Sequence, residues 1–189
     1  MKFSSRLIVG IAILLPLITW GARQQTPAKP MRQISAIRID TKTNINIDGR
    51  LQEDIWSQAP RQGDFLQRDP EDGSPSSQKT EFSVVYDSEY LYVGIRAFDD
   101  KPSEITGILT RRDESSPSDW LYISIDSYND HRTAFEFGMN ASGVKQDLRR
   151  FDDENADFDW DAVWEGAVAR DADGWSAEFA IPFRELRFN

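Results

Sequence analysis

An aromatic ring beside charged side chains is the feature of this sequence with the clearest chemistry. Trp120 follows Asp119 directly, and Arg112 lies a little earlier in the chain. A pyranose ring has an apolar C–H face and a rim of hydroxyl groups, so a site for it needs an aromatic plane and hydrogen-bonding neighbours. We therefore predict a weak sugar contact centred on Trp120, with Asp119 and Arg112 at its rim. The alternative is that Trp120 only covers the outer face of a sheet.

Two further tryptophans, Trp160 and Trp164, border an acidic segment. We expect both to be exposed there, either as loop anchors or as sugar contacts. Trp56 and Trp175 stand in apolar patterns and are predicted to be core residues.

The acidic segment, residues 151–161, contains six carboxylates and no basic residue. Its self-repulsion predicts a loop unless a cation compensates. Asp157, Asp159 and Asp161 supply hard oxygen ligands at short spacing, which predicts weak Ca²⁺ binding. The alternative is a solvated loop, or one paired with arginines that lie near it in the sequence.

The composition disfavours several classes of function. The chain has no cysteine and one histidine, His131, which excludes thiolate metal sites and leaves little for a Ser-His-Asp mechanism. A formal net charge of −10 disfavours nucleic-acid binding. The carboxylates crowd into polar loops, where they stay ionised, so we predict no catalytic residue and a glycoside hydrolase is the least favoured class.

The N-terminus has the pattern of a secretory signal peptide. Lys2 and Arg6 precede an apolar run from Leu7 to Trp20, which is shorter than the ~20 residues that span a bilayer, and small residues follow. We predict a signal peptide over 1–22 and a Pro-containing linker over 23–33. Export to the periplasm, the outer membrane or the extracellular space is the expectation.

The remaining residues, 34–189, alternate in short segments and predict one all-β domain, an antiparallel β-sandwich. Hairpins are predicted at 81–98 and 164–181, and residues 51–59 have the spacing of a short helix. Further strands are expected at 34–40, 44–47, 120–126, 133–140 and 144–150. The predicted core consists of Leu91, Val93, Ile95, Leu121, Ile123, Ile125, Phe135, Phe137, Phe179 and Ile181.

Four sequence blocks resemble the family 9 carbohydrate-binding domain. They are Ile47-Asp48-Gly49-Arg50 with Asp54-Ile55-Trp56, then 84–96, 118–126 and 173–183. The resemblance covers residues 34–188 and implies a noncatalytic sugar-binding sandwich. Residues 110–114, 130–135 and 159–164 resemble a branch that precedes a C-terminal region like an outer-membrane barrel in large exported bacterial proteins.

The resemblance also implies two ligand-stacking tryptophans, one in the loop before Asp119. Ser116 stands at that position, and the second tryptophan would follow the last hairpin. We therefore expect a domain truncated at its C-terminus that lacks its last strands. A glycan is the expected ligand. The rival interpretation is a noncatalytic interaction module that packs on an outer-membrane barrel or another partner and binds no glycan.

Overall fold

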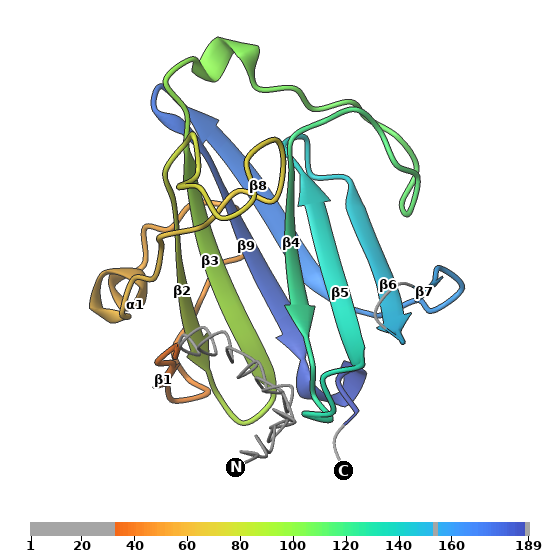
Figure 1. The fold of residues 1–189 in the computed structure, drawn as a ribbon. Helices are drawn as coiled ribbons and strands as arrows, with labels where there is room; N and C mark the ends of the chain where they lie inside the picture. Colours follow the sequence, from red (N-terminus) through yellow and green to blue (C-terminus); the bar gives the residue numbers. More distant parts are fainter. Residues whose placement is uncertain (1–32, 153–154, 188–189) are drawn as a thin grey trace, which may run out of the picture. The chain divides into compact units, whose positions relative to one another are not determined.

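The computed structural model describes residues 33–152 and 155–187 (Figure 1). The predicted signal peptide and residues 23–32 of the predicted linker lie outside them. Residues 34–189 make up one compact unit. In the described part of the chain, no helix has both the length and the apolar character needed to cross a membrane.

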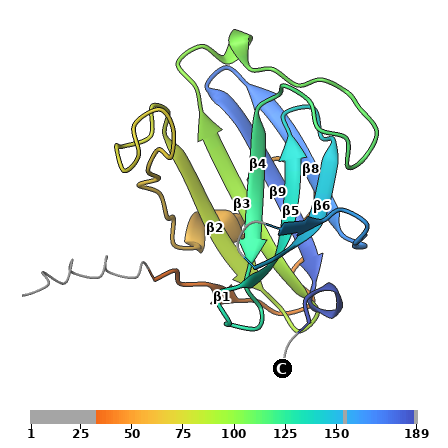
Figure 2. The ribbon, with the colours of Figure 1, turned by 45° about the vertical axis from the view of Figure 1, so that its right-hand side comes forward.

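Two β-sheets pack face to face, as Figure 2 shows most clearly for β4 and β5 in front of β3 and β9. The five-stranded sheet has the order β1 (Ile37–Arg38), β2 (Thr80–Tyr86), β3 (Tyr90–Phe98), β9 (Gly174–Pro182), β8 (Glu165–Asp171). The four-stranded sheet runs β4 (Trp120–Ile125), β5 (Thr133–Asn140), β6 (Lys145–Phe151), β7 (Asn155–Asp157). Every pairing is antiparallel except that of β1 with β2. The predicted β-sandwich is confirmed.

Both predicted hairpins are present. β2 and β3 pair with Val84 opposite Val93, and β8 and β9 meet at the turn before Gly174. Gly174 has φ +140°, and a Cβ built there would lie 2.1 Å from the carbonyl oxygen of Ala97 on β3. Only glycine fits this turn, because it tolerates positive φ and has no side chain to collide with the neighbouring strand.

The core lies between the inner faces of the two sheets. Strand alternation places one apolar row of each strand inside, where apolar surface is removed from water. Of the predicted core, Val93, Ile95, Phe135, Phe137, Phe179 and Ile181 are buried, and Leu91, Leu121, Ile123 and Ile125 are partly buried against them. Trp175 joins this core as predicted, whereas Trp56 is buried in a separate cluster with Ala59 and Val85.

Four predicted elements differ from the structure. The strand predicted at 34–40 shortens to the two residues of β1. The 44–47 strand is absent, because the backbone N–H of Asn46 donates to the Glu53 carboxylate instead of to a neighbouring strand. The predicted helix shortens to α1 (Asp54–Gln58). The loop prediction for 151–161 is wrong in part, because β7 pairs with β6 and Arg149 compensates Asp157 with an ion pair of 3.0 Å. Short 3₁₀ turns cover Pro102–Glu104 and Phe183–Glu185.

Candidate functional site

The outer face of the four-stranded sheet carries an aromatic pair. Trp120 and Tyr122 alternate with the inward-facing Leu121 on β4, so both rings lie outside the core. Their rings stack with centroids 5.5 Å apart and planes 17° from parallel. The Trp120 indole N–H donates to the carbonyl oxygen of Ser116 at 3.1 Å, while the Tyr122 residue stays 44% exposed.

Gly138 makes room for the Tyr122 ring. The two residues are directly paired across β4 and β5, and a Cβ at Gly138 would lie 2.3 Å from the tyrosine Cε1. The ring therefore lies against bare backbone, and its hydroxyl donates to the Gln146 side-chain oxygen at 2.8 Å. Burial raises the pKa of Tyr122, which keeps this hydroxyl a donor. The Tyr122 ring is therefore held by the backbone at Gly138 and by the hydrogen bond of its hydroxyl to Gln146.

An ion pair between the buried Glu136 and the partly exposed Arg150 lies on the same face. Arg150 donates from Nε and from one terminal nitrogen to the two Glu136 oxygens at 2.8 and 2.9 Å, and Ser124 donates to the same carboxylate at 2.8 Å. Burial opposes ionisation of Glu136, but Arg150 and Ser124 outweigh it, so the Glu136 pKa lies below its usual value. The arrangement offers fixed charge to hydroxyl groups beside the Tyr122 ring.

Loop residues close one side of this surface. Gln146 donates to the carbonyl oxygen of Asp113 at 3.3 Å and to the Ser115 hydroxyl at 3.4 Å. We call the whole surface the aromatic face. Its members are Trp120, Tyr122, Ser124, Glu136, Gly138, Gln146 and Arg150.

Comparison with known families shows to which family this chain belongs. A family model described as carbohydrate family 9 binding domain-like matches residues 47–188, which is most of the chain. The chain belongs to this family. A comparison with curated protein sequences finds no match.

Two solved structures of a family 9 carbohydrate-binding module from Caldicellulosiruptor kristjanssonii are similar in fold. One is in complex with cellotriose and the other with glucose. Both have a TM-score of 0.52 and 17% sequence identity, and both alignments cover 78% of this chain. They cover 67% and 69% of the respective modules. At this identity the likeness supports the β-sandwich and carries no residue-level assignment.

Within this family 9 domain, the two residues predicted to rim Trp120 each bind another group of the protein. The Asp119 carboxylate accepts the backbone N–H of Thr106 at 2.7 Å. Arg112 binds the Asp147 carboxylate, and Asp147 pairs with the core residue Phe137 across β5 and β6, so it lies on the inner side of the sheet. The guanidinium of Arg112 is thus bound to a carboxylate of the inner side, and its role at the rim of Trp120 stays a prediction.

The two tryptophans beside the acidic segment pack into the domain. Trp164 is 4% exposed, stacks on Phe179 at 5.6 Å and donates its indole N–H to Asp147. Trp160 is half-buried against Phe135 and Phe137. The expected exposure of Trp164 is wrong, because the segment between β7 and β8 passes from one sheet to the other and closes the core.

The predicted Ca²⁺ ligands are held by other groups. Asp157 pairs with Arg149, Asp161 pairs with Arg112 at 3.0 Å, and Asp159 is exposed. Among residues 33–152 and 155–187, no three acidic, histidine or cysteine side chains come close enough to hold a metal ion. Asp157, Asp159 and Asp161 therefore form no metal site in the described structure.

Sequence reasoning missed most of the aromatic face. The signal for Tyr122 was present, because strict alternation puts it on the same side as Trp120. Gly138, Gln146 and the Glu136–Arg150 pair had no local signal. Their proximity depends on the register of β5 and β6 against β4.

Proposed function

We propose that this family 9 domain binds carbohydrate without catalysing its breakdown, and that the aromatic face is the binding site. The observation that carries the proposal is the Tyr122 ring, which lies over Gly138, stacks with Trp120 and stays 44% exposed next to the Glu136–Arg150 pair. A sugar ring can stack its C–H face on such a plane while its hydroxyls bond to charged groups.

The ligands of the similar folds favour a glucose-based sugar as the first probe. Cellotriose and glucose are named for the Caldicellulosiruptor modules, and this chain shares their fold. The Trp120 and Tyr122 rings stack on each other, and Glu136, Gln146 and Arg150 extend the aromatic face beyond them, so a chain of sugar rings makes more contacts with this face than a single ring does. We expect cellotriose to bind more tightly than glucose. An exposed face buries less of a ligand than an enclosed cleft does, so the affinity should be modest.

The electrostatics of the aromatic face support binding in place of hydrolysis. A catalytic acid in a glycosidase needs a raised pKa so that it is protonated near neutral pH. Glu136, the carboxylate next to Tyr122, has a lowered pKa because Arg150 and Ser124 stabilise its charge. The residue is therefore suited to accept hydrogen bonds from hydroxyl groups and unsuited to donate a proton.

The N-terminal pattern supports an exported module. We propose that the protein acts in the periplasm, at the outer membrane or outside the cell, as an accessory to polysaccharide breakdown. The sequence support is the positive and apolar pattern of residues 1–22.

A second candidate function is an interaction module without a glycan ligand, which docks on an outer-membrane barrel or another partner. The observation in its favour is the exposure of apolar side chains on the loops, with Leu109 at 78% and Val163 at 68%. This candidate predicts no saturable sugar binding, and it predicts that the aromatic face tolerates substitution.

Titration calorimetry of the full chain with cellotriose and glucose separates the two candidates. Tyr122→Ala and Trp120→Ala should each abolish measurable binding, because each removes one ring of the stacked aromatic pair, and both should leave the melting temperature nearly unchanged. The matched control is Tyr90→Ala, which removes a half-buried tyrosine of the other sheet and should bind like the wild type. No saturable binding by the wild type, or full binding by Tyr122→Ala, contradicts the proposal.

A further inference from the structure

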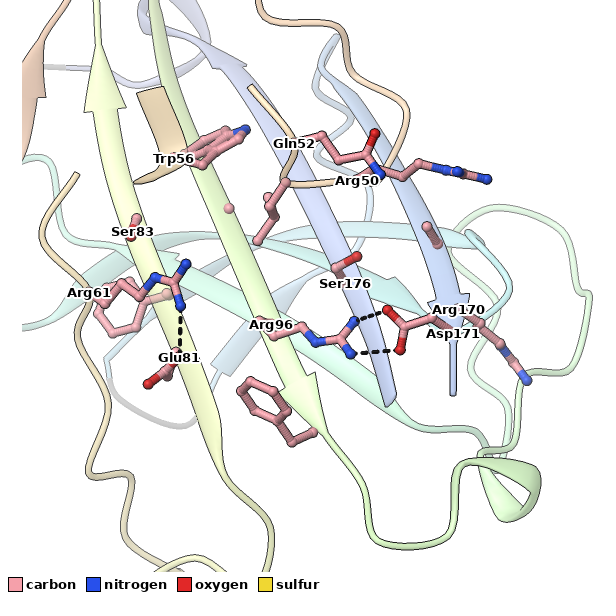
Figure 3. A pocket seen from close by; sticks show the side chains of 15 residues that line it. Arg50, Gln52, Trp56, Arg61, Glu81, Ser83, Arg96, Arg170, Asp171 and Ser176 are labelled. Carbon is pink, nitrogen blue, oxygen red and sulfur yellow. Dashed lines mark hydrogen bonds and ion pairs between the residues drawn. The ribbon is translucent and has the colours of Figure 1, made fainter. Parts of the chain in front are cut away.

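A separate hollow of about 400 Å³ lies on the outer face of the five-stranded sheet (Figure 3). Residues of the segment 50–56, of β2, β3 and β9, and of the end of β8 line it. Its volume is within the range of small-ligand pockets, at the lower end. The hollow faces away from the aromatic face, because the two lie on outer faces of opposite sheets.

The lining is cationic although the chain as a whole is acidic. Arg50, Arg61, Arg96 and Arg170 line the hollow together with only two carboxylates, Glu81 and Asp171, whereas the net charge of the protein is −10. A local excess of positive charge in an acidic protein attracts anions to this position.

Two of the four arginines are already committed to the protein. Arg96 forms a two-pronged ion pair with Asp171, with nitrogen–oxygen distances of 2.6 and 2.7 Å. Arg170 donates to the carbonyl oxygens of Ala141 and Ile105. These contacts fix the hollow's shape and leave little of either guanidinium for a ligand.

The other two arginines are available. The Arg61 side chain is 64% exposed and lies 3.5 Å from Glu81, but Glu81 is bound more closely by Lys79 at 2.7 Å. The hydrogen bond from Lys79 is the main reason that the Glu81 pKa is lowered. Within the described residues, the Arg50 guanidinium has no hydrogen-bond or ion-pair partner. Figure 3 shows Arg61 and Arg50 on opposite sides of the hollow.

The rest of the lining suits a sugar ring better than a bare anion. The partly exposed Leu51 and Phe98 contribute apolar surface, and Ser83 and Ser176 contribute hydroxyl oxygens. Both serines donate to backbone carbonyls, of Pro60 and Gly49 respectively, so their oxygens are oriented to accept. Gln52 adds an amide that can donate or accept at the rim.

We propose that this hollow is a second binding site, for a sugar that carries a carboxylate, such as a uronic acid residue of an acidic polysaccharide. Arg61 takes the carboxylate, because a guanidinium binds a carboxylate through two parallel hydrogen bonds. The sugar hydroxyls donate to the serine oxygens. Arg50 binds the sugar from the side of the hollow opposite Arg61. The site is independent of the neutral-sugar site proposed on the aromatic face.

Titrations of the full chain with glucuronate, glucose and acetate test this site. Glucuronate should bind saturably, at least fivefold more tightly than acetate, and more weakly as salt is added because exposed charges are screened. Glucose should not compete for this site. Acetate binding as tightly as glucuronate would reduce the hollow to a simple anion site and overturn the proposal.

Variants locate the bound glucuronate. Arg61→Gln should weaken glucuronate binding at least fivefold and Arg50→Gln about twofold, whereas the control Arg68→Gln, an exposed arginine outside the hollow, should change nothing. Tyr122→Ala should leave glucuronate binding intact even though it abolishes cellotriose binding. Glucuronate binding that survives Arg61→Gln unchanged, or that disappears in Tyr122→Ala, refutes the second site. A failure of the wild type to bind cellotriose, with glucuronate binding intact, would contradict the proposed site on the aromatic face and leave the second site supported.

Discussion

On the outer face of each sheet an aromatic ring lies over a glycine, but one ring is exposed to solvent and the other is buried. On the four-stranded sheet the Tyr122 ring lies over Gly138, and on the five-stranded sheet the Trp56 ring lies over Gly94. A Cβ at Gly94 would be 3.1 Å from the Trp56 ring and 2.6 Å from Leu51. Yet Tyr122 is 44% exposed and Trp56 only 3%.

What covers each ring explains the difference. Trp56 belongs to α1 and lies in a small apolar cluster with Ala59, Val85 and Leu51, and its indole N–H donates to the buried Glu178 at 2.9 Å. Tyr122 belongs to the sheet itself, and its hydroxyl is bonded to Gln146. The ring on the helix that covers the sheet is buried in an apolar cluster, whereas the ring on the strand itself stays exposed and available to a ligand.

The largest expected effect is on stability. Trp56→Ala should lower the free energy of unfolding by about 3–5 kcal/mol, because it empties a buried indole volume and leaves Glu178 without one donor. Tyr122→Ala should cost less than about 1 kcal/mol, since the ring is half in water. Urea unfolding of both variants measures the difference. Similar losses in the two would mean that the two rings do not differ in role.

The buried carboxylates under the two faces should respond to pH in opposite directions. Burial raises the pKa of Glu178 to about 7, and the nearby Glu53 adds to the rise, while the N–H groups of Gly49 and Trp56 oppose it. In the unfolded chain the value is near 4.5. The folded state therefore holds a proton that the unfolded chain has released between these two pH values.

The stability that protonated Glu178 contributes should be fully present below about pH 4.5 and lost as the pH rises through about 7, by about 3 kcal/mol. Glu136 should have the opposite effect. Arg150 lowers its pKa, so the stability that the ionised carboxylate contributes is lost only as the pH falls. Urea unfolding of the wild type between pH 4.5 and 8 measures the slope. Glu178→Gln should flatten it, and an unchanged slope in this variant rules out Glu178 as the cause.

The glycines under the two rings should change stability less than Trp56 does. Gly94→Ala should cost about 1–3 kcal/mol, since the new methyl group must displace Leu51 and Trp56 in a packed cluster. Gly138→Ala should cost less, because the exposed Tyr122 ring can lift into water. This movement tilts the Tyr122 ring on which the sugar is proposed to stack. Gly138→Ala should therefore weaken cellotriose binding about fivefold, which corresponds to the loss of one stacking contact of about 1 kcal/mol. Calorimetry with cellotriose checks this, and Gly94→Ala is the control that should bind normally.

Much of the fold could be predicted because its signals are local. The alternation in 120–126 and 133–140 and the turn before Gly174 each depend on neighbouring residues alone, and the structure confirms them. The 44–47 segment also alternates, yet it pairs with no strand. Alternation indicates which side chains share a face, but hydrogen-bond partners come from elsewhere in the chain.

The candidate site was predicted less well, because sequence proximity is a poor guide to neighbours in a sandwich. Arg112 is near Trp120 in the chain, but it binds Asp147 on the other side of the sheet. Glu136 and Arg150 lie on different strands, and register alone brings them together beside Tyr122. The acidic segment repels itself in isolation, whereas in the fold Arg149 and Arg112 neutralise two of its carboxylates.

Local sequence patterns are enough to predict that the chain forms a sandwich of short strands, which rows of side chains face its core, and that Trp120 and Tyr122 share an outer face. Those properties follow from a two-residue period and from turn residues, both of which are local. The packing of distant segments places Tyr122 on Gly138, covers Trp56 and brings four arginines around one hollow. Each of these contacts joins distant segments, and strand register and loop packing determine which residues meet there.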